Sequence, residues 1–293
     1  MNSKDARSGP PAGWPKSREW EGSGWLSVTE ARATTGLRVT DSPYWGAWWA
    51  QALRGVLYVK GIPYHKVVHP PFSDSDPDAQ SELRAWTGQT SVPTMVYNDG
   101  SGLGDVVRND WLNQLMLAEQ ISPEPSLIPG TPELRIRMIG LAHELMSPQG
   151  FLWNCRLAGR EVDAQAKMSD RQRDVFGGDK LLGGKYSFNG KSGTPLENAK
   201  ECLGLLGAQL DENRARFGGP YLVGDSLSAL DIYWAYASNS VLILPPDKLP
   251  VMRFNRAMYP AMNEALAPAC SDRLLEHRDA MFATHLECPV VVD

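Results

Sequence analysis

The chain has 293 residues, of which 42% are hydrophobic and 22% charged, a composition typical of a folded protein and a length that favours two domains. Its formal net charge of -5 provides no basic surface for a nucleic-acid backbone, and no stretch approaches the roughly 18 consecutive apolar residues of a membrane span. No secretion signal is visible at the start, and the four cysteines have neither metal-binding nor C-x-x-C spacing. We therefore expect a cytoplasmic protein with reduced cysteines that binds no nucleic acid, membrane or metal.

The first segment, residues 1–24, is rich in glycine and proline, which predicts a loose N-terminal arm without regular structure. Three tryptophans lie in or beside it, at Trp14, Trp20 and Trp25. They leave open a second arrangement, in which the arm is docked on the surface of the protein. Ser27 and Glu30 then have the spacing of a capping box, which predicts a short helix that stops at Gly36.

From residue 36 the pattern alternates between strands and helices, as in an α/β layer. The predicted strands are 37–40, 64–68 and 93–97, with a hairpin after Asp99-Gly100, and the predicted helices are 43–60, 76–86 and 109–119. Pro43 suits the first turn of the first helix and Gly61 its end. A proline-rich linker follows residue 121, so we predict an α/β domain at 36–121, preceded by the arm and its short helix at 1–35.

Beyond the linker, helix start signals recur without strand alternation. They are Thr131-Pro132, Ser169-x-x-Gln172, Thr194-Pro195, Ser228-x-x-Asp231 and Ser271-Asp272. Apolar residues in 196–217 recur at spacings of three, four and seven, which is typical of a helix packed on a core. We therefore predict an all-helical domain at 130–288.

One of these signals is part of a longer motif. The segment Tyr221-Leu222-Val223-Gly224-Asp225-Ser226-Leu227-Ser228-Ala229-Leu230-Asp231-Ile232 resembles the helix start in the second domain of the glutathione transferase superfamily. In physical terms the Ser228 side chain can cap the free amide of Asp231, and the Asp231 carboxylate can cap the Ser228 amide. The alternative to a family motif is that any buried helix can start in this way. The resemblance implies a glutathione transferase fold, with a thioredoxin-like α/β N-terminal domain and an all-α C-terminal domain. It also implies a homodimer.

A second resemblance lies in Thr90-Ser91-Val92-Pro93-Thr94, which is similar to the Val-Pro turn ahead of the third strand in thioredoxin-like folds. In those folds the proline is cis, so that the backbone of the preceding residue can pair with the peptide backbone of glutathione. The resemblance thus implies a cis bond between Val92 and Pro93 and glutathione contacts at both. An ordinary trans proline opening an edge strand is the alternative.

The third resemblance is Asp41-Ser42-Pro43-Tyr44-Trp45, between the first strand and the first helix, where relatives carry Ser or Cys. It implies that Ser42 is catalytic: its hydroxyl can hydrogen-bond the sulfur of glutathione and favour the nucleophilic thiolate, helped by the helix end. Serine cannot form a mixed disulfide, which favours transferase or isomerase chemistry over thiol–disulfide exchange. In the alternative, Ser42 only caps the helix begun by Pro43.

The resemblance is weakest at the start of the third helix of the α/β domain. Relatives place Glu-Ser or Gln-Ser there to hold the γ-glutamyl group, whereas this chain has Arg108 and Asn109. The Asn109 amide can still hydrogen-bond glutathione, but Arg108 would bind a carboxylate and not an ammonium group. Both residues are therefore candidate glutathione contacts and also the main departure from the family pattern.

The function implied by the resemblance is that of an enzyme with glutathione as co-substrate, whose thiolate attacks a small hydrophobic electrophile. Tyr44, Trp45 and Trp153 are the candidates for contacts with that electrophile. Conjugation, ether cleavage, dehalogenation and isomerisation share the thiolate step and are not separated by these motifs. The alternative is a binding or structural member of the fold that has lost glutathione, for which Arg108 and Asn109 are the argument.

Overall fold

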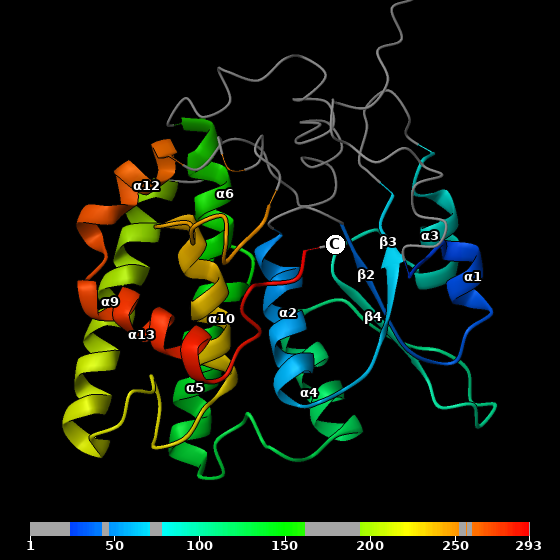
Figure 1. Ribbon diagram of the computed structural model, residues 1–293, viewed down its shortest axis with the longest axis horizontal. Helices are drawn as coiled ribbons and strands as arrows, with labels where there is room; N and C mark the ends of the chain where they lie inside the picture. The colour runs from blue at the N-terminus through cyan, green and yellow to red at the C-terminus, as the bar shows by residue number, and fades with distance from the viewer. Residues whose placement is uncertain are drawn as a thin grey trace, which may run out of the picture.

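The computed structural model describes residues 24–42, 47–70, 78–161, 194–251, 256 and 260–292. Its first part is a five-stranded mixed sheet with helices on both faces, and its second part consists of helices that stand beside one of those faces (Figure 1). Within the described ranges, no helix is long and apolar enough to cross a membrane.

The sheet contains both parallel and antiparallel strands. They are β1 (Trp25–Leu26), β2 (Gly36–Asp41), β3 (His65–Val68), β4 (Thr94–Asn98) and β5 (Val106–Arg108). Their order across the sheet is β1-β3-β2-β4-β5, with β1, β3 and β2 parallel and with β4 antiparallel to both β2 and β5. The three predicted strands are confirmed as β2, β3 and β4. β1 was not predicted, because two residues are too short for an alternating pattern, and it places Trp25 beside Lys66 in the sheet.

Four helices accompany the strands: α1 (Val28–Arg32), α2 (Trp48–Val59), α3 (Ser81–Thr87) and α4 (Trp111–Ile121). α1 and α3 lie on one face of the sheet, and α2 and α4 lie on the other, toward the helical part (Figure 1). The predicted capping box at the start of α1 is confirmed, because Ser27 Oγ accepts from the Glu30 amide and the Glu30 carboxylate accepts from the Ser27 amide. The predicted helix over 76–86 is α3, which begins only at Ser81.

The start of α2 differs from the prediction. The helix begins at Trp48 and not at Pro43, and its N-cap is Ala47, which makes no side-chain capping bond. Residues 43–46 lie outside the described ranges, and they include Gly46, whose low helix propensity disfavours an earlier start. Ser42 is therefore not the N-cap of α2, and the role of its hydroxyl stays a prediction.

The second part contains α5 (Pro132–Met146), α6 (Phe151–Glu161), α9 (Pro195–Phe217), α10 (Ala229–Ala237), η1 (Ser238–Ser240), α12 (Pro260–Leu266), η2 (Ala267–Ala269) and α13 (Asp272–Thr284). The start signals at Thr131, Thr194, Ser228 and Ser271 are confirmed as N-caps, and the signal at 169–172 lies outside the described residues. The apolar stripe of α9 is buried at Ala199, Leu203, Leu206 and Leu210.

α10 is buried along its whole length and packs against α2, which joins the two parts into one apolar core (Figure 1). The approach is closest at Gly55 of α2. A Cβ added there would lie 2.4 Å from Tyr236 Cε2 and 2.8 Å from Ile232 Cγ2, so only glycine fits. Between the two parts, α4 ends at Ile121 and α5 begins at Pro132; the division into domains at 36–121 and 130–288 stays a prediction.

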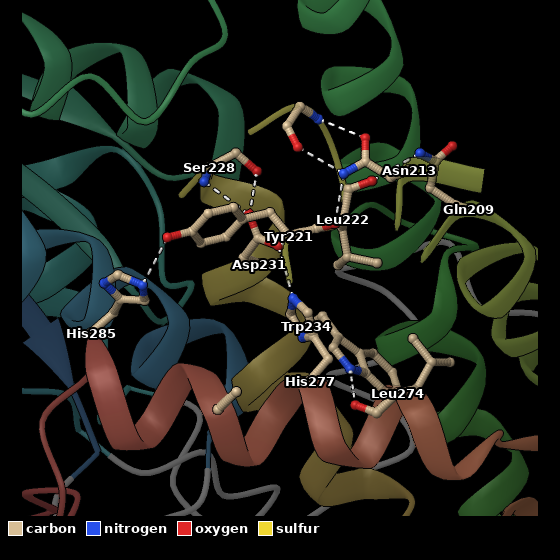
Figure 2. A network of polar contacts seen from close by, with 12 residues as sticks. Gln209, Asn213, Tyr221, Leu222, Ser228, Asp231, Trp234, Leu274, His277 and His285 are labelled. Atoms are coloured by element: carbon tan, nitrogen blue, oxygen red, sulfur yellow. Dashed lines mark hydrogen bonds and ion pairs between the residues drawn. The ribbon is translucent and has the colours of Figure 1, made fainter. Parts of the chain in front are cut away.

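The predicted capping box of α10 is confirmed and forms part of a larger polar network (Figure 2). Asp231 is fully buried, and its Oδ2 accepts from the Ser228 amide at 2.9 Å and from the Ser228 hydroxyl at 2.8 Å. Its Oδ1 accepts from the Leu222 amide at 2.7 Å and from His277 Nε2 at 2.9 Å. The carboxylate thus caps α10 and also ties the preceding loop and α13 to it.

Candidate functional site

Three of the predicted site segments meet at one end of the sheet. The register pairs Thr40 at the end of β2 with Thr94 at the start of β4, and it pairs Met95 with Arg108 at the end of β5. Because both pairings are antiparallel, the end of β2, the start of β4 and the end of β5 lie side by side. Ser42 and Val92 each lie two residues beyond the last β2–β4 pair, so the tertiary structure brings them to the same edge.

Ser42 follows β2 directly and is half-buried. Its backbone amide donates to Oδ1 of Asp41 at 2.7 Å. Among the residues that the structure describes, none hydrogen-bonds the Ser42 hydroxyl, which can therefore donate to a ligand. The helix that was expected to assist this hydroxyl has its first residue at Trp48, so a contribution of the α2 dipole at Ser42 stays a prediction.

The bond between Val92 and Pro93 is cis, as predicted. The loop around it is held by side chains from several places: Thr40 Oγ1 accepts from the Thr94 amide at 2.9 Å, and His69 Nε2 donates to the Thr90 carbonyl at 2.9 Å. Thr94 Oγ1 donates in turn to the Ser91 carbonyl at 2.7 Å. Pro93 is buried and Val92 half-buried at this edge.

Arg108 ends β5 and Asn109 precedes α4, with Arg108 half-buried and Asn109 exposed. The two segments are joined by Gln114 of α4, a buried residue that the sequence analysis missed. Its Nε2 donates to the Pro93 carbonyl at 2.9 Å and also lies 3.3 Å from the Arg108 carbonyl. The sequence did contain one signal for this residue, a glutamine on the core-facing side of a short amphipathic helix. A buried amide there needs a hydrogen-bond partner, which points to a structural role.

The residue before Ser42, Asp41, forms an ion pair with Arg54. Asp41 is buried, and its Oδ2 is 3.5 Å from Nη1 of Arg54 on α2, whose side chain is also buried. Burial raises the pKa of Asp41 to about 6, although the nearby Arg54 and Lys66 charges and the hydrogen bond from Ser42 oppose the rise. At neutral pH the carboxyl group is therefore mostly ionised.

Of the three residues predicted to contact the electrophile, only Trp153 lies within the described ranges. Tyr44 and Trp45 lie outside the described ranges. Trp153 is half-buried in α6, where its ring lies 6.0 Å from the Arg156 guanidinium, and its place at the site stays a prediction. Of the two tryptophans that open α2, Trp48 is buried in the core, and Trp49 Nε1 donates to the Met146 carbonyl at 2.7 Å.

The four cysteines are free thiols. Cys155 and Cys202 are buried, Cys270 is half-buried and Cys288 is exposed. Burial raises the pKa of the Cys202 thiol to about 12. A protonated thiol is a poor nucleophile, so Cys202 is not expected to act as one.

No protein-family model matches the chain, and no curated protein matches its sequence. Among solved structures, it is similar to a glutathione S-transferase from Xanthobacter autotrophicus Py2, with 15% identity, 88% of this chain and 98% of that chain covered, and a TM-score of 0.51. It is also similar to a glutathione transferase from Pseudomonas putida with one glutathione disulfide bound per subunit, with 14% identity, 86% and 95% covered, and a TM-score of 0.49. At these identities the likeness establishes the fold alone. The chain has the glutathione transferase fold, with a thioredoxin-like α/β part and an all-helical part, as predicted.

Proposed function

We propose that this chain, which has the glutathione transferase fold, is a glutathione-dependent transferase that acts on a small hydrophobic electrophile. The observation that carries the proposal is the convergence of Ser42, Val92-Pro93 and Arg108-Asn109 at one end of the sheet. These segments are far apart in the sequence, and their motifs alone predict glutathione contacts at each of them. In line with the fold, we further propose a cytoplasmic homodimer.

In the proposed reaction, the Ser42 hydroxyl donates a hydrogen bond to the sulfur of bound glutathione. This bond favours the thiolate over the thiol, because it stabilises the charged form. The sulfur then forms a bond to an electrophilic carbon, and a leaving group departs with the electron pair of its own bond, or the electrons move onto an adjacent acceptor atom. The thiol proton is released to solvent before the attack.

The remaining segments would hold the tripeptide in place. The backbone of Val92 would pair with the peptide groups of glutathione, and Gln114 keeps that loop beside the start of α4. Arg108 and Asn109 would bind a carboxylate of glutathione through the guanidinium and the side-chain amide. Tyr44, Trp45 and Trp153 are the proposed apolar contacts of the electrophile.

The test combines glutathione calorimetry with turnover of a nitro-activated aryl chloride, whose thioether product is followed by absorbance. Ser42→Ala should lower kcat about a hundredfold with glutathione affinity little changed, because removing one such donor costs roughly 2 to 4 kcal/mol in the transition state. Ser42→Cys should gain disulfide-exchange activity. Ser228→Ala is the control, a buried serine of the α10 cap that should keep full kcat. Full turnover in Ser42→Ala would remove Ser42 from the mechanism.

A second candidate function is a binding or structural protein of this fold that does not use glutathione. The observation in its favour is Arg108 beside exposed Asn109, in place of the residues that relatives use for the γ-glutamyl group. If the chain has this function, glutathione should show no saturable binding even at millimolar concentration. The calorimetric titration of the native chain therefore distinguishes the two functions before any variant is made.

A further inference from the structure

The turn that leaves β2 is held from two sides by a single residue, Asp41. Its Oδ1 accepts from the Ser42 amide at 2.7 Å, and its backbone carbonyl accepts from the His69 amide at 2.9 Å. Asp41 is only 3% exposed. The main chain at Ser42 is therefore tied, through its amide, to the buried carboxylate of Asp41.

The carboxylate is placed by charged and polar groups from the elements packed around it. Arg54 of α2 faces Oδ2 at 3.5 Å, Lys66 of β3 contributes a second positive charge, and Tyr64 lies next to Arg54. A buried ion pair of this kind contributes little net stability, because desolvation of the charges offsets their attraction. An uncharged asparagine could accept the same bond from the Ser42 amide, so stability alone does not explain an aspartate here.

We propose that Asp41 is a positioning residue for the Ser42 hydroxyl, an inference that rests on the proposed glutathione-dependent function. The ionised carboxylate makes a charge-assisted bond to the Ser42 amide and is anchored by Arg54, which restrains the backbone at Ser42 and thus the place from which its hydroxyl reaches the sulfur. Protonation of Asp41 weakens both contacts. Turnover should then fall as the pH decreases through about 6, where this carboxyl group titrates.

The decisive measurement is a double-mutant cycle between Asp41 and Ser42, with kcat as the readout. Ser42→Ala removes the hydroxyl but keeps the amide that Asp41 holds. Asp41→Asn should lower kcat about tenfold in the native chain and less than about twofold in the Ser42→Ala background, because residues that act as a unit are not additive. Glutathione affinity should stay unchanged in both backgrounds. An equal fold-loss in the two backgrounds would overturn the inference.

The pH profile of kcat gives a second readout that a merely structural role would not move. The native chain should show an additional acid limb near pH 6 that Asp41→Asn lacks, whereas the limb of the bound thiol is common to both. The matched control is Asp105→Asn, because Asp105 pairs with Arg38 at 2.6 Å, away from Ser42, and should leave the profile unchanged. A kcat that rises in Asp41→Asn would mean that the charge only opposes the thiolate, and would also overturn the inference.

Hydrogen exchange of the Ser42 amide tests the same contact without a variant and without turnover. After correction for the intrinsic rate, protection in the native chain should be lost below about pH 6. Protection that does not change with pH would overturn the positioning role of Asp41 but would leave the proposed function standing. An absence of both glutathione binding and turnover in the native chain instead refutes the proposed function, and the inference falls with it.

Discussion

Replacement of Asp231 by alanine should be among the most damaging single changes outside the site. It removes the acceptor of four hydrogen bonds, from the Leu222 amide, the Ser228 amide, the Ser228 hydroxyl and His277 Nε2, in a place with no solvent access. Each buried donor left without a partner costs about 1 to 3 kcal/mol, and the chain relaxes in part. We expect a loss of about 4 kcal/mol, above the roughly 0.5 to 2 kcal/mol that the capping box alone predicts.

The assay is equilibrium urea unfolding followed by circular dichroism. Ser228→Ala removes only one of the four donors and should cost about 1 kcal/mol. The control is Thr131→Ala, an exposed N-cap whose Oγ accepts from the Leu134 amide at 3.5 Å and has no long-range partner among the described residues. A loss in Asp231→Ala no larger than that in Thr131→Ala would refute the reasoning, as would unchanged stability with abolished turnover.

Three further predictions concern packing, pH and assembly. Gly55→Ala should lower the free energy of unfolding by about 1 to 3 kcal/mol, because the new Cβ overlaps the buried side chains of Tyr236 and Ile232; an unchanged urea midpoint would contradict this. Burial raises the pKa of Asp41 from 3.8 to about 6, so between these pH values the native state keeps a proton that the unfolded chain releases. The stability that this proton provides is therefore lost as the pH rises from about 4 to about 6. Relative to Asp41→Asn, the native chain should therefore lose up to about 3 kcal/mol between pH 4 and 7, and a constant difference would count against it. Light scattering should give about twice the 32.3 kDa chain mass if the proposed homodimer forms, and a monomer mass would exclude it.

Much of the fold could be predicted because its signals are local. The capping boxes at Ser27 and Ser228 act over three residues, so the pattern of caps is visible without tertiary structure. The alternation of strands and helices before residue 121, and its absence afterwards, separated the α/β part from the helical part in the same way. The cis bond at Pro93 was likewise recognised from a short motif.

The start of α2 and the existence of β1 were not predicted, because no local signal of comparable strength marks them. β1 is two residues long and depends on pairing with β3, whose partner residues are 41 positions further along the chain. A short strand of this kind is stabilised by its neighbour in the sheet and not by its own sequence. Pro43 is permitted at a helix start but does not require one, which is why the prediction began the helix too early.

The sequence by itself determined which side chains could carry the chemistry: Ser42 after a strand, Val92-Pro93 before one, and Arg108-Asn109 at a helix start. Only the tertiary structure decided that these segments share one end of the sheet, because strand order and register depend on pairings between distant residues. It alone also revealed the Asp41–Arg54 pair and the bridge made by Gln114. Buried polar groups need hydrogen-bond partners, and these partners often come from distant parts of the chain, so local sequence spacing does not predict them.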